Sequence, residues 1–266
     1  MRLKLYYLFF AFISFGIHNL LAQNLIKTKE FESKNNFTET DPLGFIYSVD
    51  EQEIIKHDSK GKILSRFSTR NYGNITSADV SNPLKIILFF KDFSAMLILD
   101  NMLNPSGDII ALENLGIPRA GMVCRAFDNG FWIFDTDKIQ LQRFSNSSEI
   151  ISQSGNLNQL ISNSIKLKDM KEANNKVYLL NQDSCLFEFD IFGTYLKTLK
   201  LKENQKIQIK ENRILTWSQN KIYILDEKSL FQQEIDFLEF KIKSISFFYN
   251  QLIISDGKKI CIYDIL

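Results

Sequence analysis

The sequence predicts an all-β protein built from six similar units, each with four short strands. The first observation is a repeat in which one polar residue ends an apolar, strand-like run, and its copies are Asp58, Asp100, Ser145, Asp190, Asp226 and Asp264. Successive copies lie 36 to 45 residues apart, a period typical of β-propeller blades and of helical repeats. The other two observations are the composition of the units and an isolated strand pattern near the start of the chain.

The composition of the units distinguishes strands from helices. In the second unit, turn-forming residues separate short apolar runs at 75–80, 85–90, 95–99 and 108–112. The fourth unit repeats this plan at 165–170, 177–180, 186–189 and 195–199. Runs rich in β-branched and aromatic residues between turns are typical of hairpins, and no long stretch has the 3.6-residue period of a helix. Four strands per unit, repeated around an axis, predict a six-bladed β-propeller.

The isolated strand pattern lies at residues 25–31, where apolar and polar side chains alternate. The sixth unit has a third strand at 259–264 and lacks a fourth. We therefore expect the N-terminal strand to complete the last blade, because this closes the ring and removes an open sheet edge. Residues 23–266 contain no linker or change of composition, and their length suits one propeller domain.

Residues 1–22 have the features of a secretory signal peptide. Arg2 and Lys4 precede an apolar run at residues 5–17, and Ala22 precedes a candidate cleavage point at Gln23. The run is shorter than the roughly 20 residues that a transmembrane helix needs. We expect an exported protein, in the periplasm or at the periplasmic face of the outer membrane, with an uncleaved anchor as the alternative.

Charge and cysteine content disfavour several classes of protein. The chain has 32 Lys and Arg, 31 Asp and Glu and a net charge of +1, with both signs interspersed. A nucleic-acid partner is therefore not expected, since it needs a concentrated basic surface. Cys124, Cys185 and Cys261 lie in or beside apolar runs without the paired spacing of a zinc site, and we expect buried free thiols.

Residue types that common catalytic mechanisms need are scarce. His57 is the only histidine outside the predicted signal peptide. It adjoins Asp58 in a strand, where neighbouring side chains point to opposite faces. A Ser-His-Asp triad and a multi-histidine metal site are not expected, and no phosphate-binding glycine loop occurs. We predict that the protein is not an enzyme and binds no cofactor or metal, and we assign no catalytic residue.

An alternative is a propeller that binds a small ligand or carbohydrate, including a calcium- or carboxylate-dependent hydrolase. Four polar side chains lie near the ends of predicted innermost strands and are candidates to converge at a channel mouth: Asp79, Asp128, Asp169 and Asn250. Turn capping also explains each of them.

Two further patterns have a functional and a structural interpretation. Alternating lysines at 165–168 and 240–243 suit either a basic channel lining or solvated strand faces. Trp132 and Trp217 are expected to pack between blades rather than to form a sugar-binding surface.

Several turns and strands resemble known propellers. Residues 58–64 and 190–196 resemble the Asp-x-x-Gly turns of NHL-type six-bladed propellers, in which Asp caps the turn and Gly adopts a positive φ. Residues 79–90, 97–101 and 131–135 resemble a family of exported bacterial propellers that includes a plug on the periplasmic face of the type IX secretion translocon.

The second resemblance implies a function without identifying a functional residue. It implies a non-enzymatic, exported protein-interaction platform whose partner is an outer-membrane β-barrel translocon. It also implies that the protein is peripheral to the membrane at most.

Overall fold

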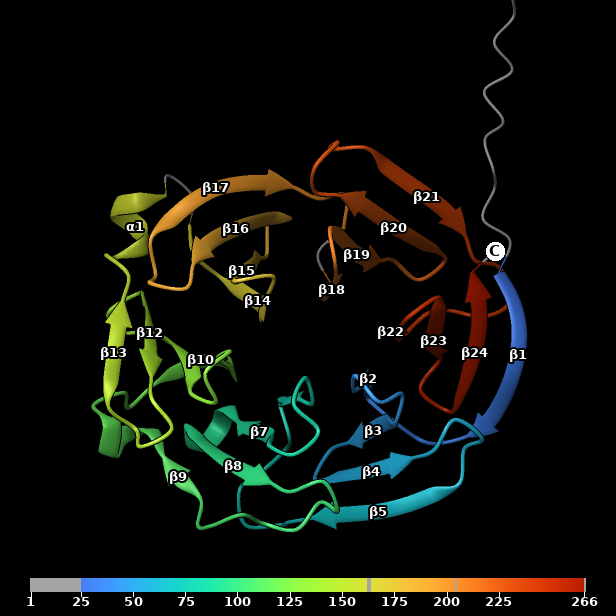
Figure 1. Cartoon of the computed structure of the whole chain (residues 1–266), viewed down its shortest axis with the longest axis horizontal. Coiled ribbons are helices and arrows are strands. Elements are labelled where there is room, and N and C mark those ends of the chain that lie inside the picture. The colour runs from blue at the N-terminus through green and yellow to red at the C-terminus, as the bar shows by residue number, and fades with distance from the viewer. Residues whose placement is uncertain (1–24, 162–163, 204, 266) are drawn as a thin grey trace, which may run out of the picture.

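The computed structural model describes residues 25–161, 164–203 and 205–265. Six four-stranded antiparallel sheets surround a central axis in these residues, which confirms the predicted six-bladed β-propeller (Figure 1). The predicted signal peptide at residues 1–22, with its cleavage point before Gln23, lies outside the described residues. Within the described ranges, no helix is both long and apolar enough to cross a membrane.

The first three blades follow the chain from the innermost to the outermost strand. Blade 1 consists of β2 (Phe37–Thr40), β3 (Ile46–Asp50), β4 (Glu53–His57) and β5 (Ile63–Ser68). Blade 2 consists of β6 (Ser77–Asp79), β7 (Ile86–Phe90), β8 (Ala95–Leu99) and β9 (Ile110–Ala111). Blade 3 consists of β10 (Ala120–Arg125), β11 (Phe131–Asp135), β12 (Gln140–Phe144) and β13 (Ile150–Gln153).

The last three blades complete the ring. Blade 4 consists of β14 (Leu167–Ala173), β15 (Lys176–Asn181), β16 (Cys185–Asp190) and β17 (Tyr195–Lys200). Blade 5 consists of β18 (Gln208–Lys210), β19 (Arg213–Trp217), β20 (Lys221–Asp226) and β21 (Gln232–Asp236). Blade 6 consists of β22 (Ser244–Phe248), β23 (Gln251–Ser255), β24 (Lys259–Ile265) and β1 (Leu25–Glu32).

The strand β1 closes the ring as the sequence predicts. It pairs antiparallel with β24, from Leu25 opposite Ile265 to Glu32 opposite Lys259. Figure 1 shows these two strands, from opposite ends of the chain, side by side at the rim. The pairing covers the edge that β24 would otherwise expose, so blade 6 has the same four-stranded form as the others.

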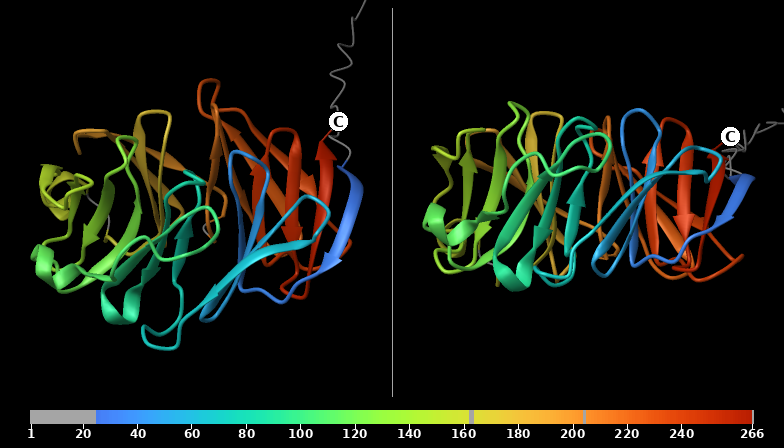
Figure 2. Two further views of the ribbon diagram at one scale, coloured as in Figure 1. Left: turned by 60° about the horizontal axis from the view of Figure 1, so that its bottom comes forward. Right: turned by 90° about the horizontal axis from the view of Figure 1, so that it is seen from below.

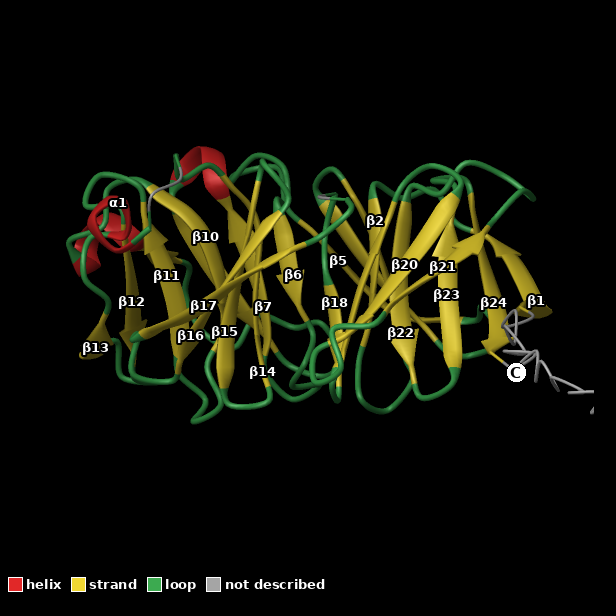
Figure 3. Cartoon of the chain, turned by 90° about the horizontal axis from the view of Figure 1, so that it is seen from above, coloured by secondary structure: helices red, strands yellow, loops and turns green. Residues whose placement is uncertain are grey.

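Strand direction alternates within each blade, so the loops lie on two opposite faces of a flat ring (Figure 2). One face carries the loops that join the first strand to the second and the third strand to the fourth in each blade, and we call it the turn face. The helix face has the loops that join second to third strands and successive blades (Figure 3). It carries the short helices η1 (Lys91–Phe93), η2 (Leu112–Leu115) and α1 (Leu157–Leu160).

Apolar packing lies mainly between neighbouring blades. Trp132 of blade 3 shares a buried cluster with Met170 and Leu179 of blade 4. Trp217 of blade 5 shares another with Ile254 of blade 6. Both indole rings are buried, which agrees with the predicted packing role, because large aromatic side chains fill sheet-on-sheet contacts well. The three cysteines are buried thiols outside any disulfide, as predicted.

The Asp-x-x-Gly pattern forms the turns that the sequence predicts. Asp58 Oδ1 accepts hydrogen bonds from the backbone N–H groups of Lys60 and Lys62, at 2.8 and 2.9 Å. Gly61 adopts a φ of +84°, a conformation that costs a residue with a Cβ. The equivalent positions at Asp190 and Gly193 have the same arrangement.

Candidate functional site

The innermost strands enclose a central cavity of about 360 Å³. All six blades contribute to its lining, from Glu39 in blade 1 to Phe247 in blade 6. Asp41, Ser81 and Tyr249 also line it and belong to loops of the turn face. The cavity therefore reaches the turn face, and its volume suits a small ligand.

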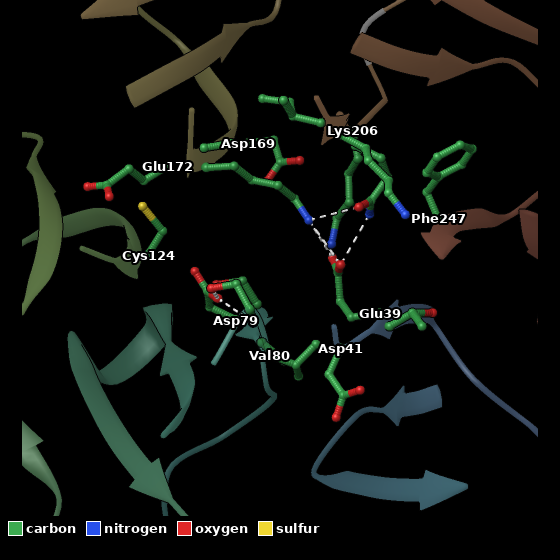
Figure 4. A pocket seen from close by; sticks show the side chains of 18 of the residues that line it. Glu39, Asp41, Asp79, Val80, Cys124, Asp169, Glu172, Lys206 and Phe247 are labelled. Carbon is green, nitrogen blue, oxygen red and sulfur yellow. Dashed lines mark hydrogen bonds and ion pairs between the residues drawn. The ribbon is translucent and has the colours of Figure 1, made fainter. Parts of the chain in front are cut away.

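A buried ion pair crosses this cavity (Figure 4). Lys171 Nζ of blade 4 lies 3.1 and 2.9 Å from the two carboxylate oxygens of Glu39, in the opposite blade 1. Gln208 accepts from Lys171 at 3.3 Å and donates to Glu39 at 3.1 Å. Burial alone would lower the pKa of Lys171, but the charges of Glu39 and Asp169 outweigh it and raise that pKa. The three side chains form a charged brace between opposite sides of the ring.

Two of the four predicted site residues line the cavity (Figure 4). Asp79 Oδ1 accepts from the N–H and hydroxyl of Ser81, and Oδ2 accepts from the N–H of Arg125 at 2.8 Å. Asp169 accepts from the backbone N–H groups of Met170 and Ile207, both at 3.0 Å. Burial raises the pKa of Asp169. Both carboxylates are thus engaged by donors of the protein itself.

The other two predicted residues lie outside the central cavity. Asp128 is in the loop between β10 and β11, where its Oδ2 lies 2.6 Å from Nη2 of Arg143. Asn250 follows β22 and donates to the carbonyl oxygen of Ile265 at 3.2 Å. The structure therefore does not bring all four predicted side chains together. Across the described residues, no group of three or more His, Cys, Asp and Glu side chains is placed to hold a metal ion.

His57 has structural contacts at the end of β4. Its Nε2 lies 2.9 Å from the hydroxyl of Ser48, and its ring centroid is 5.2 Å from that of Phe31 in β1. Burial lowers the pKa of His57, so the neutral imidazole predominates near neutral pH. These contacts link blade 1 to the closing strand and agree with the structural role expected from the sequence.

The lysines that line the cavity differ from the predicted ones. Residues 165–168 and 240–243 are not among the lining residues, and Lys243 donates instead to the carbonyl oxygen of Asn35 at 2.8 Å. The lining lysines are Lys171, Lys206 and Lys210. The Lys-x-Gln-x-Lys alternation at 206–210 is the signal that sequence reasoning missed. Lys206 precedes the short strand β18, and Gln208 and Lys210 lie in it. Positions that face the cavity recur at every second residue of such a strand.

Exposed apolar side chains gather on the turn face. Of the large exposed apolar side chains in the described ranges, eight lie there: Leu43, Leu84, Met102, Phe127, Phe192, Leu230, Phe231 and Tyr249. Three lie on the helix face, namely Phe93, Leu160 and Leu238. The remaining six are on the outermost strands. The two faces therefore differ in how much apolar surface they present.

A common turn geometry presents four of these side chains. The N–H groups of Leu43, Met102 and Phe192 each donate to the Asp side chain two residues earlier, at 2.8 to 2.9 Å. The N–H of Leu84 donates in the same way to Asn82. The hydrogen bond fixes the turn, so the side chain at its tip points into solvent from a defined backbone position.

Contacts between blades brace the turn face around the whole ring. They are Lys56 with Asn101, Asn82 with Asn129, Arg143 with Ile191, Asn174 with Glu211, Lys210 with Tyr249, and Phe248 with Gly44. Gly44 has a φ of +86°, and a Cβ there would lie only 2.8 Å from the Phe248 ring, so this junction needs glycine. The exposed tips therefore sit on a scaffold that is connected between every pair of neighbouring blades.

Comparisons with known proteins identify the fold. No protein-family description and no curated protein matches the chain. A streptogramin B lyase structure is 13% identical with a TM-score of 0.63, covering 91% of this chain and 97% of that one. A chain of a mitotic checkpoint complex is 7% identical with a TM-score of 0.64, covering 90% and 94%. At such low identity the likeness shows the propeller architecture alone.

Proposed function

We propose that the protein is a non-enzymatic platform that docks a partner protein on its turn face. The observation that carries this proposal is the ring of exposed apolar side chains on braced turns. Such side chains are costly to leave in water and are typical of interaction surfaces. A braced surface loses little conformational entropy on binding, which favours a stable complex.

We further propose that the protein is exported and that its partner is the outer-membrane β-barrel of a type IX secretion translocon. The support is the signal-like segment at residues 1–22 and the resemblance of residues 79–90, 97–101 and 131–135 to the plug family. In this role the flat ring blocks or braces the periplasmic opening of the barrel. Export is tested by intact mass, which should correspond to a chain that begins at Gln23.

A hydrolytic function has less support because the cavity carboxylates are already engaged. Asp79 and Asp169 accept hydrogen bonds from neighbouring N–H groups, which leaves them poorly placed to activate water. The double variant Asp79→Asn, Asp169→Asn should therefore retain partner binding if its melting curve remains normal. Loss of function in a normally folded double variant would instead point to carboxylate chemistry.

The docking proposal is tested by matched variants of the two faces. The turn-face variant replaces Leu43, Leu84, Phe192 and Phe231 with Ser, and the control replaces Phe93, Leu160 and Leu238 on the helix face. All seven side chains are exposed, so both variants should fold. Affinity purification from detergent-solubilised envelopes should recover a β-barrel protein with the wild type and the control only. Equal recovery with the turn-face variant would refute the proposal.

A further inference from the structure

Two cavity lysines form no salt bridge within the described residues, although Lys206 interacts electrostatically with Asp169 and Lys210 with Glu211. Lys206 and Lys210 flank Gln208 on the alternating, inward-facing positions of blade 5. Lys171 pairs with Glu39, but neither Lys206 nor Lys210 makes a side-chain hydrogen bond or an ion pair with the rest of the described chain. An ammonium group has three N–H donors, so this leaves unused donor capacity inside the cavity.

Aromatic rings hold these two ammonium groups in place. Lys206 Nζ lies 3.8 Å from the ring centroid of Phe37. Lys210 Nζ lies 4.3 Å from the centroid of Tyr249 and 5.3 Å from that of Phe247. Cation–π contacts of this kind position a cation without supplying a hydrogen-bond acceptor. Lys210 is at the end of the cavity that meets the turn face, beside the exposed ring of Tyr249.

The acidic groups of the same cavity are already satisfied. Asp41 accepts from the N–H groups of Leu43 and Phe45 and from the hydroxyl of Tyr47. Glu172 accepts from the indole N–H of Trp132 at 2.6 Å. Glu39, Asp79 and Asp169 are engaged as described above. The unused N–H donors of the cavity therefore belong to ammonium groups, which favours a ligand whose negatively charged acceptor lies close to Lys210 at the mouth rather than beside the five lining carboxylates.

We propose that the turn-face mouth of the cavity binds a carboxylate that is attached to an aromatic group. Lys210 donates to the carboxylate, and the exposed ring of Tyr249 packs against the aromatic part. A dianionic phosphate is disfavoured more strongly than a monoanionic carboxylate, because five carboxylates and only three lysines line the cavity. The ligand is either a free small acid or the C-terminal carboxylate of a polypeptide. The proposed site shares Tyr249 with the turn face, but neither Tyr249 nor Lys210 is changed in the turn-face variant, so the two proposals are tested separately.

Calorimetry with a matched pair of probes tests this site. N-acetyl-L-phenylalanine carries the carboxylate, and N-acetyl-L-phenylalanine amide is its neutral counterpart. The acid should bind at least tenfold more tightly, as expected for loss of a charge-assisted hydrogen bond. Lys210→Met should remove this preference, whereas Lys241→Met, outside the cavity lining, should leave it unchanged. A melting curve checks that each variant is folded.

Two further probes distinguish the source of the carboxylate. The peptide Gly-Ser-Gly-Phe with a free C-terminus should bind more tightly than N-acetyl-L-phenylalanine if the natural ligand is a polypeptide end, and more weakly if it is a small acid. Equal binding of acid and amide, no binding of either at millimolar concentration, or unchanged affinity in Lys210→Met would each overturn the proposal. None of these outcomes bears on the turn-face variants, so the two proposals fail separately.

Discussion

The ion pair across the cavity can be tested by removing its cation. In Lys171→Met, Glu39 loses both short contacts to the ammonium group and keeps only the hydrogen bond from Gln208. Glu39 is 7% exposed, so its charge cannot regain full hydration without a local rearrangement. An unpaired buried carboxylate is strongly destabilising, which makes this single substitution informative.

The size of the effect follows from the burial of the two partners. Breaking a fully buried pair costs about 3–5 kcal/mol. The side chain of Lys171 is 23% exposed, so this pair is partly hydrated, and we expect roughly 2–3 kcal/mol. For a domain of this length, 1 kcal/mol shifts the melting temperature by about 2–4 °C, which gives a decrease of roughly 4–12 °C.

Thermal melting monitored by circular dichroism measures this decrease. The double variant Glu39→Leu, Lys171→Met should melt within a few degrees of the wild type, because it removes both charges together. The pKa of Lys171 is raised in the folded state. The contribution of the ion pair to the free energy of unfolding is therefore fully present below the ordinary lysine pKa of about 10.4, and it is lost as the pH rises through the folded-state pKa. The difference should therefore be constant from about pH 6 to 9. A single variant as stable as the wild type, or a double variant less stable than the single one, would refute the reasoning.

Three other predictions concern closure and turns. Hydrogen bonds from Lys259 and, to a smaller extent, Lys27 lower the pKa of Glu30 to about 2. The Glu30 carboxylate therefore stabilises the folded protein above the ordinary Glu pKa of about 4.3, and this stabilisation is lost as the pH falls through about 2. Glu30→Gln should therefore melt below the wild type at pH 7, and the two melting temperatures should converge at pH 2. Ser145→Asp with Ser148→Gly restores the Asp-x-x-Gly turn where Ser148 has a φ of +66°, and should raise the melting temperature by about 2–4 °C, measured by calorimetry. Deletion of residues 25–32 exposes the edge of β24 and should produce oligomers in size-exclusion chromatography, whereas Lys29→Ala should remain monodisperse.

The repeat and the closing strand could be predicted because their signals are local. Asp58 and Asp190 each lie three residues before a glycine with positive φ, and strand alternation at residues 25–31 is visible without knowledge of its partner. One copy of the turn was missed, at Asp41 and Gly44 between β2 and β3. Another copy is hidden because Leu103, three residues after Asp100, adopts the positive φ without glycine. The turn at Asp226 is one residue longer, with the positive φ at Leu230.

The cavity could not be predicted in the same way. Glu39 and Lys171 are 132 residues apart, and only closure of the ring brings them together. Innermost strands such as β18 are three residues long, too short for their alternation to stand out in the sequence. Proximity to a predicted strand end does not distinguish the lining position of Asp79 from the loop position of Asp128.

Site-specific photo-crosslinking in the native envelope tests the docking account most directly. A photoreactive phenylalanine analogue replaces Phe192 on the turn face or Leu238 on the helix face, which are 65% and 84% exposed. Comparable exposure makes the two positions a matched pair for capture of a neighbouring protein. We expect a crosslink from position 192 to a β-barrel partner and none from position 238. A crosslink to that barrel from position 238 alone, or none from either position, would contradict it.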